Sequence, residues 1–162
     1  MKKQRAPKRP SEAASTRGFS VRDYPFMFMH VIVTMNNRNI GEMLKPQKLS
    51  PSIWRILAIL QERDGITISE LAQQSLIERT LLGRILEGLE KRDFVQRRHD
   101  RGDKRRTVIF IRPAGIDTFR KILPIAREQI ERAIEGLGKS ELDLLQGLLG
   151  RISDNVSRRP RA

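Results

Sequence analysis

The stretch that decides the fold is residues 91–112, which read KRDFVQRRHDRGDKRRTVIFIR. Two arms, 94–99 and 107–111, are rich in residues that favour strands. Between the arms, residues 100–103 supply the Asp and Gly that favour a tight turn. The stretch therefore predicts a β-hairpin whose tip lies at Gly102.

This hairpin is strongly cationic. Eight Lys and Arg lie between Lys91 and Arg106, against three Asp. Such an excess costs self-repulsion unless a polyanion or solvent compensates it. The nucleic acid backbone is the obvious polyanion, although a charged hairpin can equally be a solvated loop. The sequence before the hairpin bears on this choice.

Residues 65–92 predict a helix-turn-helix, in which a short helix and a turn lead into a longer helix. Thr67 and Glu70 have the spacing of a capping box, in which a hydroxyl and a carboxylate bind amide groups at the start of the short helix. Glu78 is a poor cap for the longer helix, so we expect its first turn to begin at Ser75 or to be frayed. A helix-turn-helix followed by a cationic hairpin favours nucleic-acid binding.

The longer helix is amphipathic, and its apolar residues recur at helical spacing. Its buried face is expected to carry Leu82, Ile85, Leu86 and Leu89. The opposite face, the candidate DNA reader, carries Thr80, Arg84, Glu87 and Lys91. Gly83 and Gly88 each cost about 0.5–1 kcal/mol relative to alanine, a cost that close approach to the DNA backbone would explain.

Apolar helices flank this region. Residues 24–39 are apolar on nearly every side before Asn36, so we expect that helix to be buried all round. Further on, two apolar stripes have the alternating three- and four-residue steps of one helix packing along another. The first stripe comprises Ile116, Phe119, Leu123, Ala126, Ile130, Ala133 and Leu137. The second, with Ser140 as the expected cap, comprises Leu142, Leu145, Leu149, Ile152 and Val156.

These stripes need partners. The helices could pack only on their own domain, but a small domain has too little surface to cover both stripes and the run 26–33. A homodimer is the economical explanation.

Pro124 interrupts the first stripe and predicts a kink rather than a break. Ser50 and Pro51 predict the start of a scaffold helix, and Trp54 falls beside its apolar face.

Three features together resemble the MarR family of winged-helix transcriptional regulators. They are the helix-turn-helix, the sequence LEKRDFV at 89–95, and a hairpin tip with Asp100, Asp103 and Arg105. The resemblance covers about residues 24–156. It implies a mainly α fold with a small β-hairpin wing, a winged helix-turn-helix with long N- and C-terminal dimerisation helices.

The chain then divides into three parts. We expect a disordered basic arm at 1–18, a single MarR-like domain at 19–156 and a basic tail at 157–162. Within the domain, the winged helix-turn-helix is expected at 50–112. The dimerisation helices are expected at 19–49 and 113–156.

The resemblance implies a homodimer that binds a pseudo-palindromic operator in double-stranded DNA. Its recognition helices would enter major grooves while the wings, with Arg105 at the tip, reach minor grooves. We expect a repressor that a small aromatic or other organic effector releases. The candidate DNA contacts are Arg79, Thr80, Gly83, Arg84, Lys91, Arg98, Arg101, Lys104, Arg105 and Arg106.

The family's effector pocket is bounded by the first, second and fifth helices. The resemblance therefore makes Met27, His30, Trp54 and Arg55 candidate pocket residues. A methionine or a lone histidine in an apolar helix is more often a core residue, and Trp54 could equally be plain core.

Composition excludes several other classes. The chain has no cysteine, which excludes disulfides and thiol-based redox sensing. No apolar run approaches the roughly 20 residues that span a bilayer, and no signal peptide is evident, so we expect a cytoplasmic protein with no membrane partner. His30 and His99 lie far apart, and no phosphate loop or metal-ligand spacing appears. We therefore expect no enzymatic activity, no metal and no cofactor.

Two rival functions remain open. A constitutive architectural DNA-binding protein without an effector would share the basic arm and the wing, but would discriminate little between sequences. A membrane-surface or ligand-carrier protein could use the basic ends and the apolar first helix, but would not need the helix-turn-helix and wing together. The net charge of +13 favours binding to nucleic acid or to an anionic membrane surface.

Overall fold

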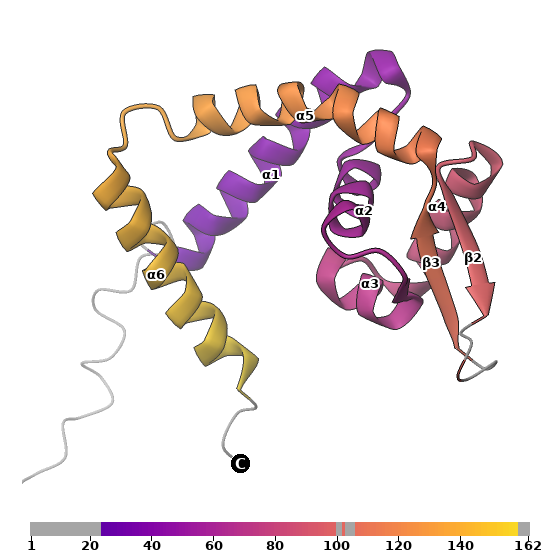
Figure 1. Ribbon diagram of the computed structural model, residues 1–162. Helices are drawn as coiled ribbons and strands as arrows, with labels where there is room; N and C mark the ends of the chain where they lie inside the picture. Colours follow the sequence, from indigo (N-terminus) through magenta and orange to yellow (C-terminus); the bar gives the residue numbers. More distant parts are fainter. Residues whose placement is uncertain (1–23, 100–101, 103–105, 159–162) are drawn as a thin grey trace, which may run out of the picture. The chain divides into compact units, whose positions relative to one another are not determined.

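The computed structural model describes residues 24–99, 102 and 106–158, which form a mainly helical fold with a small antiparallel sheet (Figure 1). The described residues belong to two compact units that divide between Asn39 and Ile40, inside the first helix. The elements in order are α1 (Pro25–Leu44), η3 (Lys45–Gln47), α2 (Pro51–Glu62), β1 (Ile66–Thr67), α3 (Ile68–Ser75), α4 (Arg79–Lys91), β2 (Val95–His99), β3 (Thr107–Ile111), α5 (Pro113–Ala133) and α6 (Lys139–Ser157). The predicted arm at 1–18 lies outside the described residues, as do positions 159–162 of the predicted tail.

The first unit contains most of α1, and its apolar side chains face solvent in the single chain. Phe28, Ile32 and Val33 are all more than half exposed. The expectation that this helix is buried all round is therefore wrong for the protomer, because only Ile40 and Leu44, at its far end, are buried. The helix itself forms as predicted.

The second unit has a continuous apolar core. Leu44, Ile56, Leu57, Leu60 and Leu71 are fully buried. Helix α4 adds Leu82, Leu86 and Leu89 to this core, as its periodicity predicts, while Ile85 is partly buried. The core fixes the angle between the helix-turn-helix and its scaffold helix α2.

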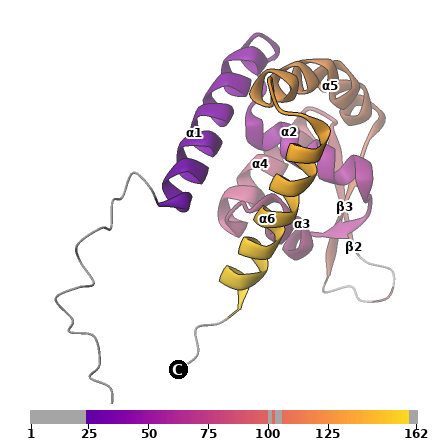
Figure 2. The ribbon, with the colours of Figure 1, turned by 90° about the vertical axis from the view of Figure 1, so that its left-hand side faces the viewer.

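Three strands form the sheet, in the order β1-β3-β2. Strands β2 and β3 pair with His99 opposite Thr107 and Val95 opposite Ile111, so the predicted hairpin is confirmed to within one residue at each end. Figures 1 and 2 show these two strands side by side, leading from α4 and back to α5. Strand β1 was not predicted, because its two residues become a strand only by pairing with Val108 and Ile109 of β3.

Helix α5 continues through Pro124, so the proline does not break the helix, as the sequence predicted. Its part up to Ala126 packs on the second unit's core: Ile122 and Ala126 are buried, and Phe119 stacks on Trp54 with ring centroids 5.1 Å apart. Ile130 and Leu137, at the far end of the predicted stripe, are exposed. The stripe is therefore divided, and only its second half is free to associate.

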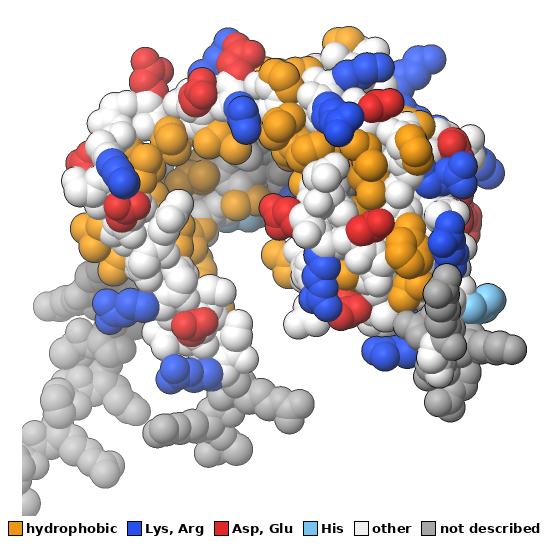
Figure 3. All heavy atoms as spheres, in the orientation of Figure 1, with side chains coloured by type: hydrophobic (Ala, Val, Ile, Leu, Met, Phe, Trp, Pro, Cys, Tyr) orange, Lys and Arg blue, Asp and Glu red, His pale blue; other side chains and the backbone are white. Residues whose placement is uncertain are grey.

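Helix α6 begins at Lys139 rather than after a cap at Ser140. Gly138 is the N-cap, and its backbone N–H donates to Glu141 Oε2 at 2.7 Å. The longer carboxylate side chain reaches back to the helix start, which a serine inside the first turn does not do. No described residue of α6 is buried, and Figure 3 shows hydrophobic side chains at the surface along α5 as well.

Among the described residues, no helix is long and apolar enough to cross a membrane.

Candidate nucleic-acid interface

The first helix of the helix-turn-helix, α3, starts with the predicted capping box. Glu70 N–H donates to Thr67 Oγ1 at 3.2 Å, and Thr67 N–H donates to Glu70 Oε2 at 2.9 Å. The Thr67 hydroxyl also donates to Glu70 Oε2 at 2.7 Å. This side-chain hydrogen bond, with that from the Thr67 amide, lowers the pKa of Glu70 below its ordinary value. The carboxylate is therefore held in its charged form at the helix start, where the helix dipole also favours it.

The second helix, α4, begins at Arg79, and Glu78 is its N-cap. The Glu78 carboxylate accepts from the N–H groups of Thr80 and Leu81 at 2.8 and 3.0 Å. These backbone hydrogen bonds lower the pKa of Glu78. The expectation of a frayed start, or of a start at Ser75, is therefore wrong, because the longer acidic side chain folds back onto the first amides of the helix.

The exposed face of α4 carries the polar residues that its periodicity placed there. Thr80, Arg84, Glu87 and Lys91 are all exposed. Nothing lies within 4 Å of the Cβ that would be added at Gly83 or Gly88, so packing inside the chain does not require either glycine. The face is open to a partner along its length.

Arg97 joins the wing to α4. Its Nη2 donates to the Gly83 carbonyl oxygen at 2.9 Å, and its Nε lies 3.1 Å from Glu90 Oε2. The Arg97 backbone N–H also donates to Glu90 Oε1 at 3.1 Å. These contacts attach β2 to the middle and to the end of the helix. Sequence alone did not identify Arg97, because its partners lie 7 and 14 residues earlier on another element.

Other basic side chains of the wing lie near the strands. The Arg98 guanidinium lies 5.2 Å from the centre of the Phe110 ring, and Arg106 precedes β3 and is exposed. Figure 3 shows Lys and Arg side chains mixed with acidic ones over the helix-turn-helix and the sheet. The predicted contacts Arg101, Lys104 and Arg105 lie outside the described residues.

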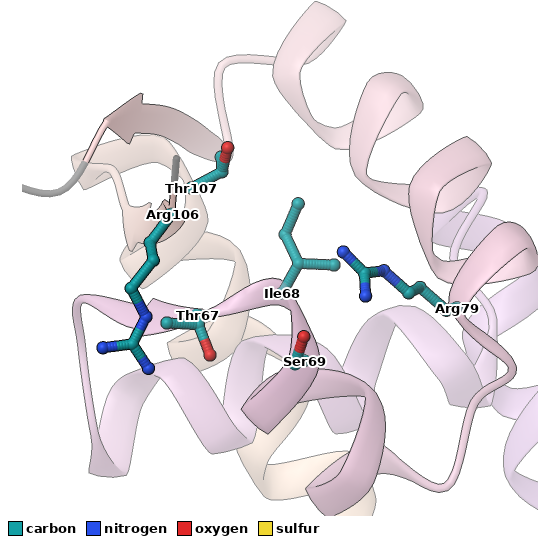
Figure 4. A pocket seen from close by; sticks show the side chains of 6 residues that line it. All are labelled: Thr67, Ile68, Ser69, Arg79, Arg106 and Thr107. Carbon is teal, nitrogen blue, oxygen red and sulfur yellow. The ribbon is translucent and has the colours of Figure 1, made fainter. Parts of the chain in front are cut away.

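A small polar pocket lies where α3, α4 and β3 begin. Its volume is about 180 Å³, and its lining comprises Thr67, Ile68, Ser69, Arg79, Arg106 and Thr107. Figure 4 shows Arg79 extending toward Ile68 on one side of the pocket and Arg106 running down beside Thr67 on the other, with Ser69 below Ile68. Sequence reasoning named both arginines but not Ser69, and nothing local in the sequence brings these three elements together.

The candidate effector residues lie on two helices. Met27 and His30 are exposed on α1 in the first unit, so the core alternative is wrong for both in the single chain. Trp54 on α2 is partly buried and packs against the second unit's core. Arg55 Nη1 donates to the Ser75 carbonyl oxygen at 2.9 Å, which ties α2 to the end of α3. That these four residues line one pocket stays a prediction.

Within residues 24–99, 102 and 106–158, no group of three or more histidine, aspartate or glutamate side chains could hold a metal ion.

Comparison with known proteins gives three matches of interest. Residues 49–107 match the model of the MarR family. The HTH-type transcriptional repressor IacR of Pseudomonas putida is 23% identical over 138 residues, which cover 85% of this chain and 83% of that protein. The crystal structure of a MarR-family transcriptional regulator from Silicibacter pomeroyi has a TM-score of 0.78 at 25% identity, over 88% of this chain and 96% of that one.

A further structure concerns the regulation of DNA binding of Bordetella bronchiseptica BpsR by 6-hydroxynicotinic acid. It has a TM-score of 0.76 at 17% identity and covers 84% of this chain and 97% of that one. At this identity the likeness concerns the fold. The matched family consists of transcriptional regulators rather than enzymes, and its matched region spans the helix-turn-helix, strand β2 and the first residue of strand β3. With its helix-turn-helix, its wing and its long flanking helices, the chain has the winged-helix fold of MarR-family transcriptional regulators, and residues 49–107 match the model of that family.

Proposed function

We propose that this DNA-binding regulator acts as a homodimer that recognises a specific operator in double-stranded DNA and represses transcription until a small organic effector releases it. The observation that carries the proposal is the exposed polar face of α4, with Thr80 and Arg84, beside a wing that Arg97 ties to the same helix. A helix in the major groove reads base edges, and a wing held at a fixed angle limits where that helix can lie.

Dimerisation is supported by apolar side chains that the single chain leaves exposed. On α1 they include Phe28, Ile32 and Val33, and on α6 they include Leu144 and Val156. Contiguous exposed apolar surface on a monomer usually marks an interface. A two-fold dimer would present two recognition helices about 34 Å apart, one turn of DNA.

Effector release is supported by the likeness to BpsR, whose DNA binding is regulated by 6-hydroxynicotinic acid. An effector releases DNA only if it binds a dimer with the wrong helix spacing more tightly than it binds the DNA-competent one. We propose that Met27, His30, Trp54 and Arg55 contribute to its pocket.

The test is a competition between specific and random DNA. The dimer is titrated against duplexes that tile the region upstream of its own gene, and against a shuffled duplex of the same length. We expect one duplex to bind at least ~10³-fold more tightly than the shuffled one at fixed salt. Equal affinities for all duplexes would instead indicate a constitutive architectural protein.

Effector response is measured in a second experiment on the same complex. Aromatic carboxylic acids are added to the protein bound to its tightest duplex while fluorescence of Trp54, the only tryptophan, is followed together with DNA release. We expect at least one such acid to release the DNA and to change the tryptophan signal. Release without any change at Trp54 would remove Trp54 from the pocket and leave the repressor proposal intact.

A further inference from the structure

We propose that the pocket between Arg79 and Arg106 holds one backbone phosphate of the bound DNA, so that a single phosphate bridges the start of α4 and the end of strand β3 nearest the hairpin tip. This inference rests on the proposed function and names one contact within it. It goes beyond a general basic surface because it assigns two arginines to the same phosphate.

The geometry of the pocket is the first argument. Arg79 is the first residue of α4, and Arg106 directly precedes β3. The two lie 27 positions apart in sequence, yet both line one cavity of about 180 Å³ above the start of α3. Figure 4 shows the two guanidinium groups on opposite sides of this cavity. A tetrahedral phosphate with charge on several oxygens can accept from both guanidinium groups at once.

The remaining lining is the second argument. Ser69 lies exposed in the first turn of α3 and supplies a hydroxyl, and Thr107 supplies another from the wing. The first helix of a helix-turn-helix crosses the DNA backbone, and hydroxyls, arginines and helix starts are common phosphate ligands. The pocket therefore combines the donors that a phosphate uses at the place where the backbone is expected to pass.

The charge balance is the third argument. Glu70 lies close enough to Arg106 for the guanidinium to lower its pKa further. However, the Glu70 carboxylate already accepts from Thr67 and from Arg63 Nη2, the latter at 3.3 Å. In the described part of the chain, no ion pair joins Arg79 or Arg106 to an acidic side chain. The pocket thus keeps positive charge that an anion can neutralise.

The experiment uses the full-length dimer and its tightest duplex. Arg79→Ala, Arg106→Ala and the double variant are compared with wild type, and Arg120→Ala on α5 is the matched control. Arg120 is also exposed, and its partner Asp117 lies on its own helix, so this variant removes the same charge away from the pocket. Circular dichroism checks that each variant is folded.

We expect each pocket variant to weaken binding to operator and to shuffled DNA by a similar factor, roughly 10-fold. The double variant should lose less than the product of the two single losses, because both side chains bind one phosphate. The slope of log affinity against log salt should fall by about 0.9 per half-site in the double variant, the value for one phosphate. A fall of about 1.8 per half-site, with multiplicative losses, would mean two separate phosphates and would overturn the proposal.

A methylphosphonate scan locates the phosphate. Replacing single phosphates one at a time by neutral methylphosphonates should reveal one position per half-site that weakens wild type but not the double variant. The absence of any such position would overturn the phosphate clamp. If the wild type binds no duplex at all, the proposed function fails; if wild type and double variant bind equally, only the clamp fails.

Free phosphate is the other source of the same chemistry. Inorganic phosphate is titrated at constant ionic strength into the free protein while the backbone NMR signal of Ser69 is followed. Weak binding that the double variant loses, together with an arginine-dependent position in the scan, supports the DNA clamp. Tight binding of inorganic phosphate without such a position would assign the pocket to a free anion and overturn the clamp.

Discussion

The Arg97 guanidinium donates to the carbonyl oxygen of Gly83 at 2.9 Å, so a wing residue holds the middle of the helix that faces solvent with Thr80 and Arg84. The same side chain pairs with Glu90 near the end of that helix. Because Arg97 contacts α4 at two points, it fixes both the position and the orientation of the wing relative to that helix. The wing and α4 should therefore meet DNA as one rigid surface.

Gly83→Ala should stabilise the fold and weaken DNA binding. The new methyl group meets nothing within 4 Å, and alanine is favoured over glycine in a helix by about 0.5–1 kcal/mol. If α4 approaches the DNA backbone closely at Gly83, the added methyl group would push the helix away from the DNA and weaken binding. Urea unfolding and gel-shift titration measure the two effects. Gly88→Ala, with equally open surroundings, should stabilise the fold likewise, and its affinity shows whether the DNA backbone also approaches the helix at this position.

Arg97→Ala should reduce specificity and cost stability. Loss of its partly buried hydrogen bond to Gly83 and of its ion pair with Glu90 is expected to lower the free energy of unfolding by about 1 kcal/mol. A wing that is no longer fixed to α4 should also bind operator and shuffled DNA with a smaller affinity ratio. An unchanged ratio at reduced stability would show that Arg97 supports the fold only.

Arg84→Ala should relax sequence preference at particular base pairs. Arg84 is exposed on the outer face of α4, where a guanidinium can bind the edge of a guanine. We expect a loss of about 1–3 kcal/mol at the base pairs that it reads, measured with a panel of single-base operator variants. A uniform loss on every duplex would instead make Arg84 a phosphate contact.

Glu70→Gln should make stability less dependent on pH. The hydrogen bonds from Thr67 lower the folded-state pKa of Glu70, so the folded state favours the charged carboxylate. That stabilisation is present above the unfolded pKa of about 4.3 and is lost as the pH falls through the lower folded pKa. The wild type should therefore have a higher Tm than the variant at pH 7, and this difference in Tm should disappear in acid. Glu87→Gln, on the exposed face of α4, controls for the loss of one negative charge.

Leu145→Glu should weaken the homodimer. Leu145 is 43% exposed on α6 in the single chain, and we expect the partner to cover it. Covering the exposed part of Leu145 in the dimer is expected to contribute about 1 kcal/mol to the free energy of dimerisation. Two-fold symmetry makes this contribution occur once in each protomer. The dimer dissociation constant should rise about 30-fold or more in sedimentation experiments. Leu76→Glu is the control, since Leu76 is 87% exposed in the turn of the helix-turn-helix and should leave the dimer intact.

Local features of this chain were readable from its sequence. The hairpin 95–111 follows from strand-forming arms around a DRGD turn, and the start of α3 follows from the Thr67–Glu70 spacing. The outer face of α4 follows from the helical spacing of its leucines. In each case the residues that interact are close in sequence, so short-range preference and periodicity are enough to predict the outcome.

The tertiary structure decided what depends on distant residues. Strand β1 exists only because two residues meet β3, and Arg97 finds Gly83 only because the wing folds back onto α4. The part of α5 up to Ala126 is covered by its own core, which periodicity alone could not distinguish from a dimer surface. Arg79 and Arg106 line one pocket for the same reason, since the path of the chain between them brings the start of α4 near the start of strand β3. Sequence spacing determines which side of an element a residue occupies, and chain folding determines what lies opposite it.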